Sequence, residues 1–244
     1  MGYKISLKDM NAALGEISKA YTIYAPKVFE GEGRFTDTDG IRYGEIQQIE
    51  EIVFDQKSDY SFKEVLTPIS ETLFYFTEDE VKEADGPTKG AIIFLRSCDL
   101  HSLQRLDDIY LHNGYEDYYY KRIRENTKFI LMGCENSFEN CFCVSMETNK
   151  TDAYDAYIKV DSADVYIDTK NQELADLFLK RATEPADVVP DFVDKNEIKV
   201  TVPDNLSLDI IESTMWQEYT ERCIACGRCN FVCPTCTCFS MQDI

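Results

Sequence analysis

Basic residues are scarce in this chain. It holds 25 Lys and Arg residues against 45 Asp and Glu residues, which gives a formal net charge of −20. Because nucleic-acid binding needs footprints of Lys and Arg on the phosphates, this balance argues against nucleic acid as a partner. It also disfavours the capture of a small anionic substrate. The acidic residues either keep the protein in solution or face a basic docking partner.

Long apolar runs are lacking as well. No stretch approaches the ~18 apolar residues of a membrane-spanning helix, and the polar N-terminus lacks the apolar core of a secretory signal. We therefore expect a cytoplasmic protein without a membrane span. Ten cysteines in such a chain favour metal ligation in a reducing compartment over disulfides.

Nucleotide-binding loops and catalytic constellations are also missing. No G-x-G-x-x-G follows a strand, no phosphate-binding P-loop occurs, and only 11 glycines are available for such loops. His101 and His112 are the only histidines, and both fall on or at the end of one expected helix. With no nucleophile, base and orienting group in view, we expect a non-catalytic chain without a bound nucleotide or flavin.

The end of the sequence carries the strongest motif. The stretch CIACGRCNFVCPTCTC contains C-x2-C-x2-C-x3-C followed by Pro234, the spacing of bacterial ferredoxin-type ligands. A structural zinc site normally brings two separated pairs instead. We therefore expect a [4Fe-4S] cluster on what we call the tail run, which consists of Cys223, Cys226, Cys229 and Cys233.

The fourth ligand of that cluster is ambiguous. In two-cluster ferredoxins the fourth cysteine of such a run ligates the other cluster, and no second copy of the motif occurs in the printed sequence. Either Cys236 or Cys238 closes the cluster locally, or the ferredoxin domain continues in further sequence. Alternatively, Cys236 and Cys238 are ordinary buried thiols.

A strand–helix–strand pattern lies upstream. The apolar runs Ala91–Leu95 and Lys128–Met132 are typical of buried strands, and the helical spacing of leucines in RSCDLHSLQRLDDIYL separates them. This pattern predicts a βαβ unit with two parallel strands. We expect an α/β domain with a partly parallel sheet over residues 1–200. Residues 201–244 are expected to form the first half of a small helical ferredoxin-type domain, which would be incomplete.

Other elements follow from local periodicity. We expect a first helix over residues 8–19, strands over Tyr21–Val28 and Ile41–Ile46, and a further strand over Pro68–Phe76. The acidic segment after Phe76 is expected to be a solvated helix end and loop. Residues 182–208, rich in proline and acid, suggest a surface connection, after which Ser207 could cap a closing helix that reaches Tyr219.

The remaining cysteines suggest a second metal site. Cys98 and Cys134 each come just after a predicted parallel strand, so both should lie at the carboxyl edge of the sheet, where α/β proteins place ligands. Cys141 and Cys143 follow closely in the loop after Cys134. We infer a second [4Fe-4S] site on these four upstream cysteines; the alternative is four buried free thiols. Arg96, Arg222 and Arg228 could stabilise reduced clusters or merely pair with carboxylates.

The chain resembles the A subunits of anaerobic sulfite reductases, within the wider group of iron-sulfur subunits related to sulfhydrogenase β subunits. The stretches that carry the resemblance are GRFTDTD, PISETLFYF, RSCDLHSLQRLD, SFENCFCVSM, TNKTD and RCIACGRCNFVCPTCTC. It implies a cytoplasmic electron-transfer subunit that relays electrons from a flavin- and NADH-binding subunit to a siroheme subunit that reduces sulfite to sulfide. Members of this group continue to a second ferredoxin motif.

Two classes of function compete at this point. Cluster ligands without substrate or nucleotide machinery indicate an electron relay, in a sulfite reductase or in a related hydrogenase or sulfur reductase. The rival is an iron-sulfur or zinc redox sensor, which should carry an output module such as a basic nucleic-acid-binding helix. The charge of −20 offers none, so the sequence favours the relay.

Overall fold

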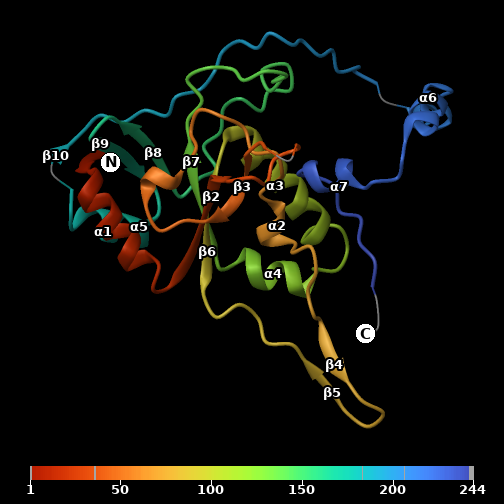
Figure 1. The fold of residues 1–244 in the computed structure, drawn as a ribbon, viewed down its shortest axis with the longest axis horizontal. Helices are drawn as coiled ribbons and strands as arrows, with labels where there is room; N and C mark the ends of the chain where they lie inside the picture. The colour runs from red at the N-terminus through yellow and green to blue at the C-terminus, as the bar shows by residue number, and fades with distance from the viewer. Residues whose placement is uncertain (1, 36, 183, 206, 242–244) are drawn as a thin grey trace.

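The main body of the protein is a mixed β-sheet between two layers of helices (Figure 1). A computed structural model describes residues 2–35, 37–182, 184–205 and 207–241. Within these residues, eight strands form one sheet in the order β10-β1-β9-β8-β7-β6-β2-β3. Their bounds are β1 (Gly2–Ser6), β2 (Tyr21–Phe29), β3 (Gly40–Glu45), β6 (Gly90–Leu95), β7 (Thr127–Met132), β8 (Ala156–Asp161), β9 (Asp164–Thr169) and β10 (Glu184–Pro185).

Helices cover both faces of this sheet. Their bounds are α1 (Leu7–Ile17), η1 (Ile49–Glu51), α2 (Lys63–Leu66), α3 (Ser97–Tyr110), α4 (Tyr118–Arg124) and α5 (Gln172–Leu179). Side chains of β6 alternate between the two layers, because successive strand residues point to opposite faces. Ile92 and Phe94 pack with α1 and α5, whereas Ile93 and Leu95 pack with α2, α3 and α4. The sequence prediction of an α/β domain is confirmed in this body.

The predicted βαβ unit is present. Strands β6 and β7 pair in parallel, with Leu95 opposite Leu131, and α3 crosses between them. Parallel pairing extends to β2 on one side and β8 on the other. The first helix is also as predicted: Ser6 accepts a hydrogen bond from the Asp9 backbone N–H and caps α1, whose buried positions are Met10, Ala13, Leu14 and Ile17.

The strand predicted over Pro68–Phe76 is wrong in most of its length. Only β4 (Phe74–Phe76) is a strand, and it pairs with β5 (Val81–Glu83) in a separate two-stranded sheet. The acidic segment expected to be a helix end and loop therefore contributes a strand. The apolar, aromatic run LFYF does favour extended backbone, but within the described chain β5 is the only strand that pairs with it.

The closing helix predicted from Ser207 to Tyr219 is interrupted. A 3-10 turn, η2 (Leu208–Glu212), ends at Ser213, which has extended backbone, and α6 (Met215–Arg222) begins after Thr214. Ser213 Oγ accepts from the Met215 N–H at 3.4 Å, so its side chain offers the backbone a local bond in place of a helical one. After α6 comes the short helix α7 (Arg228–Val232).

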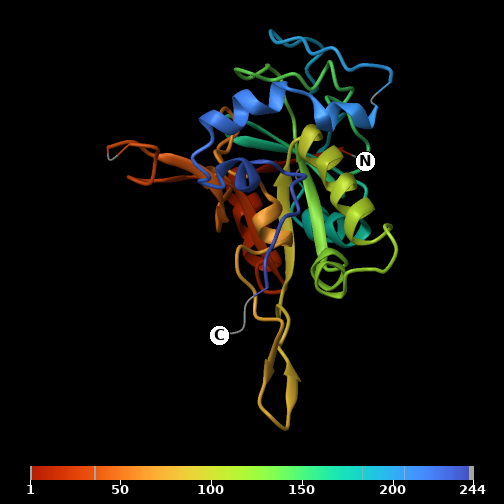
Figure 2. The ribbon, with the colours of Figure 1, turned by 90° about the vertical axis from the view of Figure 1, so that its right-hand side faces the viewer.

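Residues 201–241 build no core of their own. Apart from Leu206, which lies outside the description, none of their side chains is buried. In Figure 1, α6 stands away from the sheet, while α7 lies near α2, and the view in Figure 2 agrees for α7 and α2. A separate ferredoxin-type domain therefore stays a prediction. No helix in the described part of the chain is long and apolar enough to cross a membrane.

Candidate metal centre

Cys98 and Cys134 lie at the same edge of the sheet. Cys98 is the second residue of α3, directly after β6, and Cys134 follows β7 by two residues. The parallel pairing of β6 with β7 brings these two ends together. The sequence placed both residues at this edge because parallel strands share their carboxyl ends.

The loop with Cys141 and Cys143 is held against this edge. Ser97 Oγ donates to the Thr148 carbonyl at 2.9 Å, and the Thr148 N–H donates to the Cys143 carbonyl at 2.9 Å. Asn196 closes the loop from the other side: its Oδ1 accepts from the Val144 N–H at 2.8 Å and from the Cys143 thiol at 3.5 Å. These contacts fix Cys143 near the start of α3.

Asn196 was not anticipated from the sequence. It lies in the segment 182–208, which was expected to be a surface connection, yet its side chain is only 5% exposed. Its Nδ2 also donates to Ser137 Oγ at 2.8 Å, so one amide joins two parts of the cysteine loop. A single Asn among acidic residues gives no periodic signal, and only the fold shows its position.

Arg96 provides a buried positive charge at the centre of this edge. Its guanidinium donates to Cys134 Sγ at 3.3 Å, to the Gly133 carbonyl at 3.2 Å and to the Phe54 carbonyl at 2.6 Å. It lies over the Phe138 ring, 4.5 Å from the centroid, and is 7% exposed. Of the two roles considered for this arginine, the contact with a cysteine sulfur fits stabilisation of thiolate charge.

The four upstream thiols influence each other electrostatically. Part of the Cys98 side chain reaches solvent, but protein atoms crowd around it, and this burial raises the pKa of its thiol well above the ordinary range. The Asp99 carboxylate raises that pKa further, followed by the thiols of Cys134, Cys143 and Cys141. Burial also raises the pKa of Cys134, against the opposing effect of Arg96.

This donor set suits a soft metal centre in kind and place. Cys98 and Cys134 share a sheet edge to which the loop with Cys141 and Cys143 is bonded, and a cation that replaces the four protons would offset the repulsion between the thiolates. Within the described residues, no three Cys, His, Asp or Glu side chains already stand at ligand spacing. Binding of an iron-sulfur cluster here would therefore require the thiols to move closer together.

The tail run is arranged differently. Its first three cysteines, Cys223, Cys226 and Cys229, are exposed, and Cys233 is half-buried. Gly227, with φ of 71°, takes the left-handed conformation that glycine adopts readily, and it caps α7 just after Cys226. Burial opposes ionisation of Cys233, but hydrogen bonds from Thr235 and Cys236 outweigh it and lower its pKa. Cys236 thus lies close enough to Cys233 to stay a candidate ligand.

Side chains of the main body hold the segment around the tail run, residues 223–238, in place. Lys63 on α2 is 8% exposed, and its ammonium donates to the Cys236 carbonyl at 2.8 Å and also to the Asn230 carbonyl. Arg228 Nη1 donates to the Tyr60 hydroxyl at 3.2 Å, and its guanidinium lies 5.1 Å from the centroid of that ring. The tail run is therefore attached beside α2.

The remaining candidates have ordinary structural partners. Arg222 pairs with Glu218 at 2.9 Å, one helical turn away, which is the carboxylate-pairing role considered for it. His101 Nε2 contacts the Lys150 carbonyl at 2.8 Å, and His112 lies 3.7 Å from Asp108. No catalytic group emerges from these contacts.

Sequence comparison finds a similar protein from an archaeon. The chain is similar to the sulfhydrogenase 2 subunit beta of Pyrococcus furiosus, with 29% identity over 218 residues that cover 83% of this chain. The match spans 64% of the length of that relative. No protein-family model matches the chain. A search of solved structures finds no match either.

Proposed function

We propose that this chain is an iron-sulfur electron-transfer subunit of a hydrogenase-type or sulfur-reducing oxidoreductase complex. The observation that carries the proposal is the position of Cys98 and Cys134 at the carboxyl edge of a parallel strand pair, with the loop of Cys141 and Cys143 bonded to the same edge. An iron-sulfur cluster bound by these cysteines would take up and release single electrons. The ferredoxin-type spacing of the tail run supports a second centre on the same chain.

The protein groups around the two centres have distinct tasks in this proposal. Arg96 places a buried positive charge beside Cys134, which favours a centre that has gained an electron. Lys63 brings a second buried cation to the carbonyls of the tail, where it orients the loop around Cys236. Among the described residues, Lys63 and Arg96 are the two charged side chains that are buried, so their position near the cysteines supports the relay.

The partners of the relay follow from two resemblances. The name of the Pyrococcus relative favours a complex of the hydrogenase or sulfur-reductase type. The second candidate is anaerobic sulfite reduction, supported by the motifs around residues 33–39, 96–107 and 222–238. In that case electrons would pass from a flavin and NADH subunit to a siroheme subunit, in the cytoplasm.

Metal and sulfide analysis tests the proposal directly. The anaerobically purified protein should contain iron and acid-labile sulfide in equal amounts and give cubane signals in electron paramagnetic resonance after reduction. Cys98→Ser and Cys134→Ser should each remove about half of the iron by abolishing one of two clusters, whereas Ser102→Ala, a neighbouring change on α3, should remove none. Stoichiometric zinc without a cubane signal would refute the relay.

Activity of the intact complex separates the two candidate pathways. The complex purified with this subunit is supplied with reduced nicotinamide and offered sulfite, polysulfide or protons as acceptor. Sulfide formed from sulfite supports the sulfite reductase. Hydrogen evolution or polysulfide reduction, without turnover of sulfite, supports the hydrogenase or sulfur-reductase reading instead.

A further inference from the structure

A two-stranded arm projects from the body of the protein. We call residues 73–84, which contain β4 and β5, the β4–β5 arm; it extends away from the sheet in Figures 1 and 2. The Thr77 N–H donates to the Glu80 carbonyl at 2.7 Å and closes the tip, and the Ala84 N–H donates to the Leu73 carbonyl at 3.1 Å at the base. Every residue of both strands is exposed.

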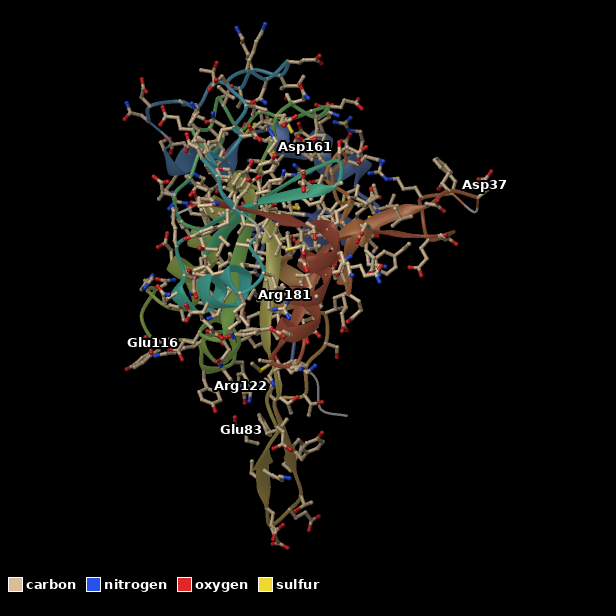
Figure 3. The ribbon with its side chains drawn as sticks, turned by 90° about the vertical axis from the view of Figure 1, so that its left-hand side faces the viewer. Asp37, Glu83, Glu116, Arg122, Asp161 and Arg181 are labelled. Atoms are coloured by element: carbon tan, nitrogen blue, oxygen red, sulfur yellow. The ribbon has the colours of Figure 1, made fainter. Side chains whose placement is uncertain are left out.

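Helix α4 fixes the direction of the arm. Arg122 pairs with Glu83 at 3.3 Å and with Glu71 at 3.2 Å, and Figure 3 shows Arg122 where the arm leaves the body. The Tyr119 hydroxyl donates to the Leu73 carbonyl at 3.3 Å, and Ala84 is buried. An isolated two-stranded hairpin is marginally stable in water, so this clamp should stabilise the arm.

One face of the arm is apolar from Phe74 to its tip, and Glu83, opposite Phe74, brings a carboxylate to the base of the same face. In the antiparallel register Phe76 lies opposite Val81, and Phe74 is two residues before Phe76, so these three side chains share a face. They are 54%, 74% and 48% exposed in that order, and the two phenylalanine rings lie 6.0 Å apart. Tyr75 and Lys82 point to the opposite face. The aromatic face is thus presented to solvent without cover from the described part of the chain.

The tip of the arm is strongly acidic. Glu78, Asp79 and Glu80 are consecutive, and Lys82 is the one basic side chain between residues 73 and 84. A second copy of this chain, with net charge −20, would bring like charges against this tip. A complementary surface must instead offer an apolar groove bordered by Lys or Arg.

We propose that the β4–β5 arm is a docking element that inserts its Phe74, Phe76 and Val81 face into a basic-rimmed apolar groove of another subunit. The proposal rests on the proposed function, because that function requires partner subunits. The clamp at Arg122 holds the arm in its bound direction, so that little freedom is lost on docking. The acidic tip guides the approach, and the aromatic face supplies the lasting contact.

Assembly of the complex tests the arm with a matched control. Tagged wild-type chain, Phe74→Ser/Phe76→Ser and Tyr75→Ser are purified from the native host, and subunit composition is measured by native mass spectrometry. The double variant should bind the partner at least about tenfold more weakly, whereas Tyr75→Ser, on the opposite face, should assemble as the wild type does. Both variants should keep their iron and their resonance signals, so loss of docking is distinguishable from failure of the cluster proposal.

Photo-crosslinking identifies the occupant. A benzophenone amino acid at position 76 should crosslink to a segment of the partner that mass spectrometry places beside Lys or Arg residues. Crosslinks to a second copy of this chain would overturn the proposal. Normal assembly of Phe74→Ser/Phe76→Ser would overturn it as well, and so would an intact wild-type complex without any crosslink at position 76.

Discussion

Arg96 holds together several backbone segments as well as the sulfur of Cys134. Its guanidinium bonds to the carbonyls of Phe54, Gln56 and Gly133, which belong to two different loops. Since buried carbonyls that lose their donor are costly, one side chain here couples the cysteine edge to the segment after η1. The residue thus has a structural and an electrostatic task.

We expect Arg96→Met to reduce the free energy of unfolding by about 3 kcal/mol, because several buried carbonyls lose their donor and the buried Asp99 carboxylate loses a neighbouring positive charge. Urea unfolding followed by circular dichroism measures this loss. Arg105→Met is the control: that exposed arginine pairs with Asp108 within α3 and should cost less than about 0.5 kcal/mol. Equal losses for the two variants would contradict the role of Arg96.

At the residue scale, the sequence predicted where Cys98 and Cys134 lie, but not which side chains hold the loops around the cysteines in place. Cys98 and Cys134 could be assigned to the carboxyl edge of the sheet because each follows an apolar run that is typical of a buried strand. Asn196 and Lys63 act through contacts with residues about 50 and more than 160 positions away in the sequence. Nothing local distinguishes such a Lys or Asn from its exposed counterparts.

At the scale of elements, α2 serves as the anchor of the tail. Lys63 extends from this four-residue helix to two carbonyls that flank Cys233 in the sequence, those of Asn230 and Cys236. No side chain of the described residues 201–241 is buried, so this segment is attached through partly exposed contacts, among them these bonds and that of Arg228.

Lys63→Met should therefore loosen the tail without unfolding the body. Loss of the two charged hydrogen bonds should favour local opening by about 2 kcal/mol, which corresponds to roughly 30-fold faster cleavage of the tail by a protease at low concentration. Lys89→Met is the matched control, because Lys89 also donates to a carbonyl, that of Ser18, but within the body. Unchanged cleavage in Lys63→Met would show that other contacts hold the tail.

An ion pair between α1 and the end of α5 makes the stability of the protein depend on pH. Arg181, just after α5 and labelled in Figure 3, donates to Glu16 on α1 at 3.0 Å. This bond lowers the pKa of Glu16 below its ordinary 4.5, although burial acts in the opposite direction. A carboxylate with a depressed folded-state pKa contributes stability that is present above the unfolded value and is lost as the pH falls through the folded value.

We therefore expect the wild type to lose more stability than Glu16→Gln as the pH falls below about 4.5. Thermal unfolding at a series of pH values measures the difference between the two slopes. Glu30→Gln removes one exposed carboxylate elsewhere and should follow the wild type. Parallel slopes for wild type and Glu16→Gln would contradict the assignment.

Element prediction succeeded where one period dominates and failed where tertiary pairing decides. The run of buried residues in β6 and the leucine spacing of α3 could be interpreted from the sequence alone. The aromatic run of β4 also favours a strand but has no place in the main sheet, and the apolar positions of η2 and α6 remain exposed. Periodicity indicates which side chains should be buried, but it does not show which elements bury them.

At the scale of the whole molecule, charge is the dominant feature. The 20 excess acidic groups are carried by a chain of 28.1 kDa, and many of its lysines and arginines are already paired with carboxylates. The long-range field of the protein is therefore negative, and it should speed association with a basic partner. The same field opposes self-association.

Ionic strength separates this field from the contact made by the arm. Since the Debye length falls from about 10 Å at 0.1 M salt to about 3 Å at 1 M, the rate of association with the partner should drop by about tenfold or more over that range. Stopped-flow mixing of subunit and partner measures this rate.

Replacement of Glu78, Asp79 and Glu80 by lysine should lower the association rate at low salt and flatten its salt dependence, because these side chains lead the approach. Phe74→Ser/Phe76→Ser should leave the salt dependence unchanged and raise the dissociation rate, because apolar contact forms only after encounter. If the phenylalanine changes instead altered the salt dependence and the lysine changes did not, steering would belong to another part of the surface.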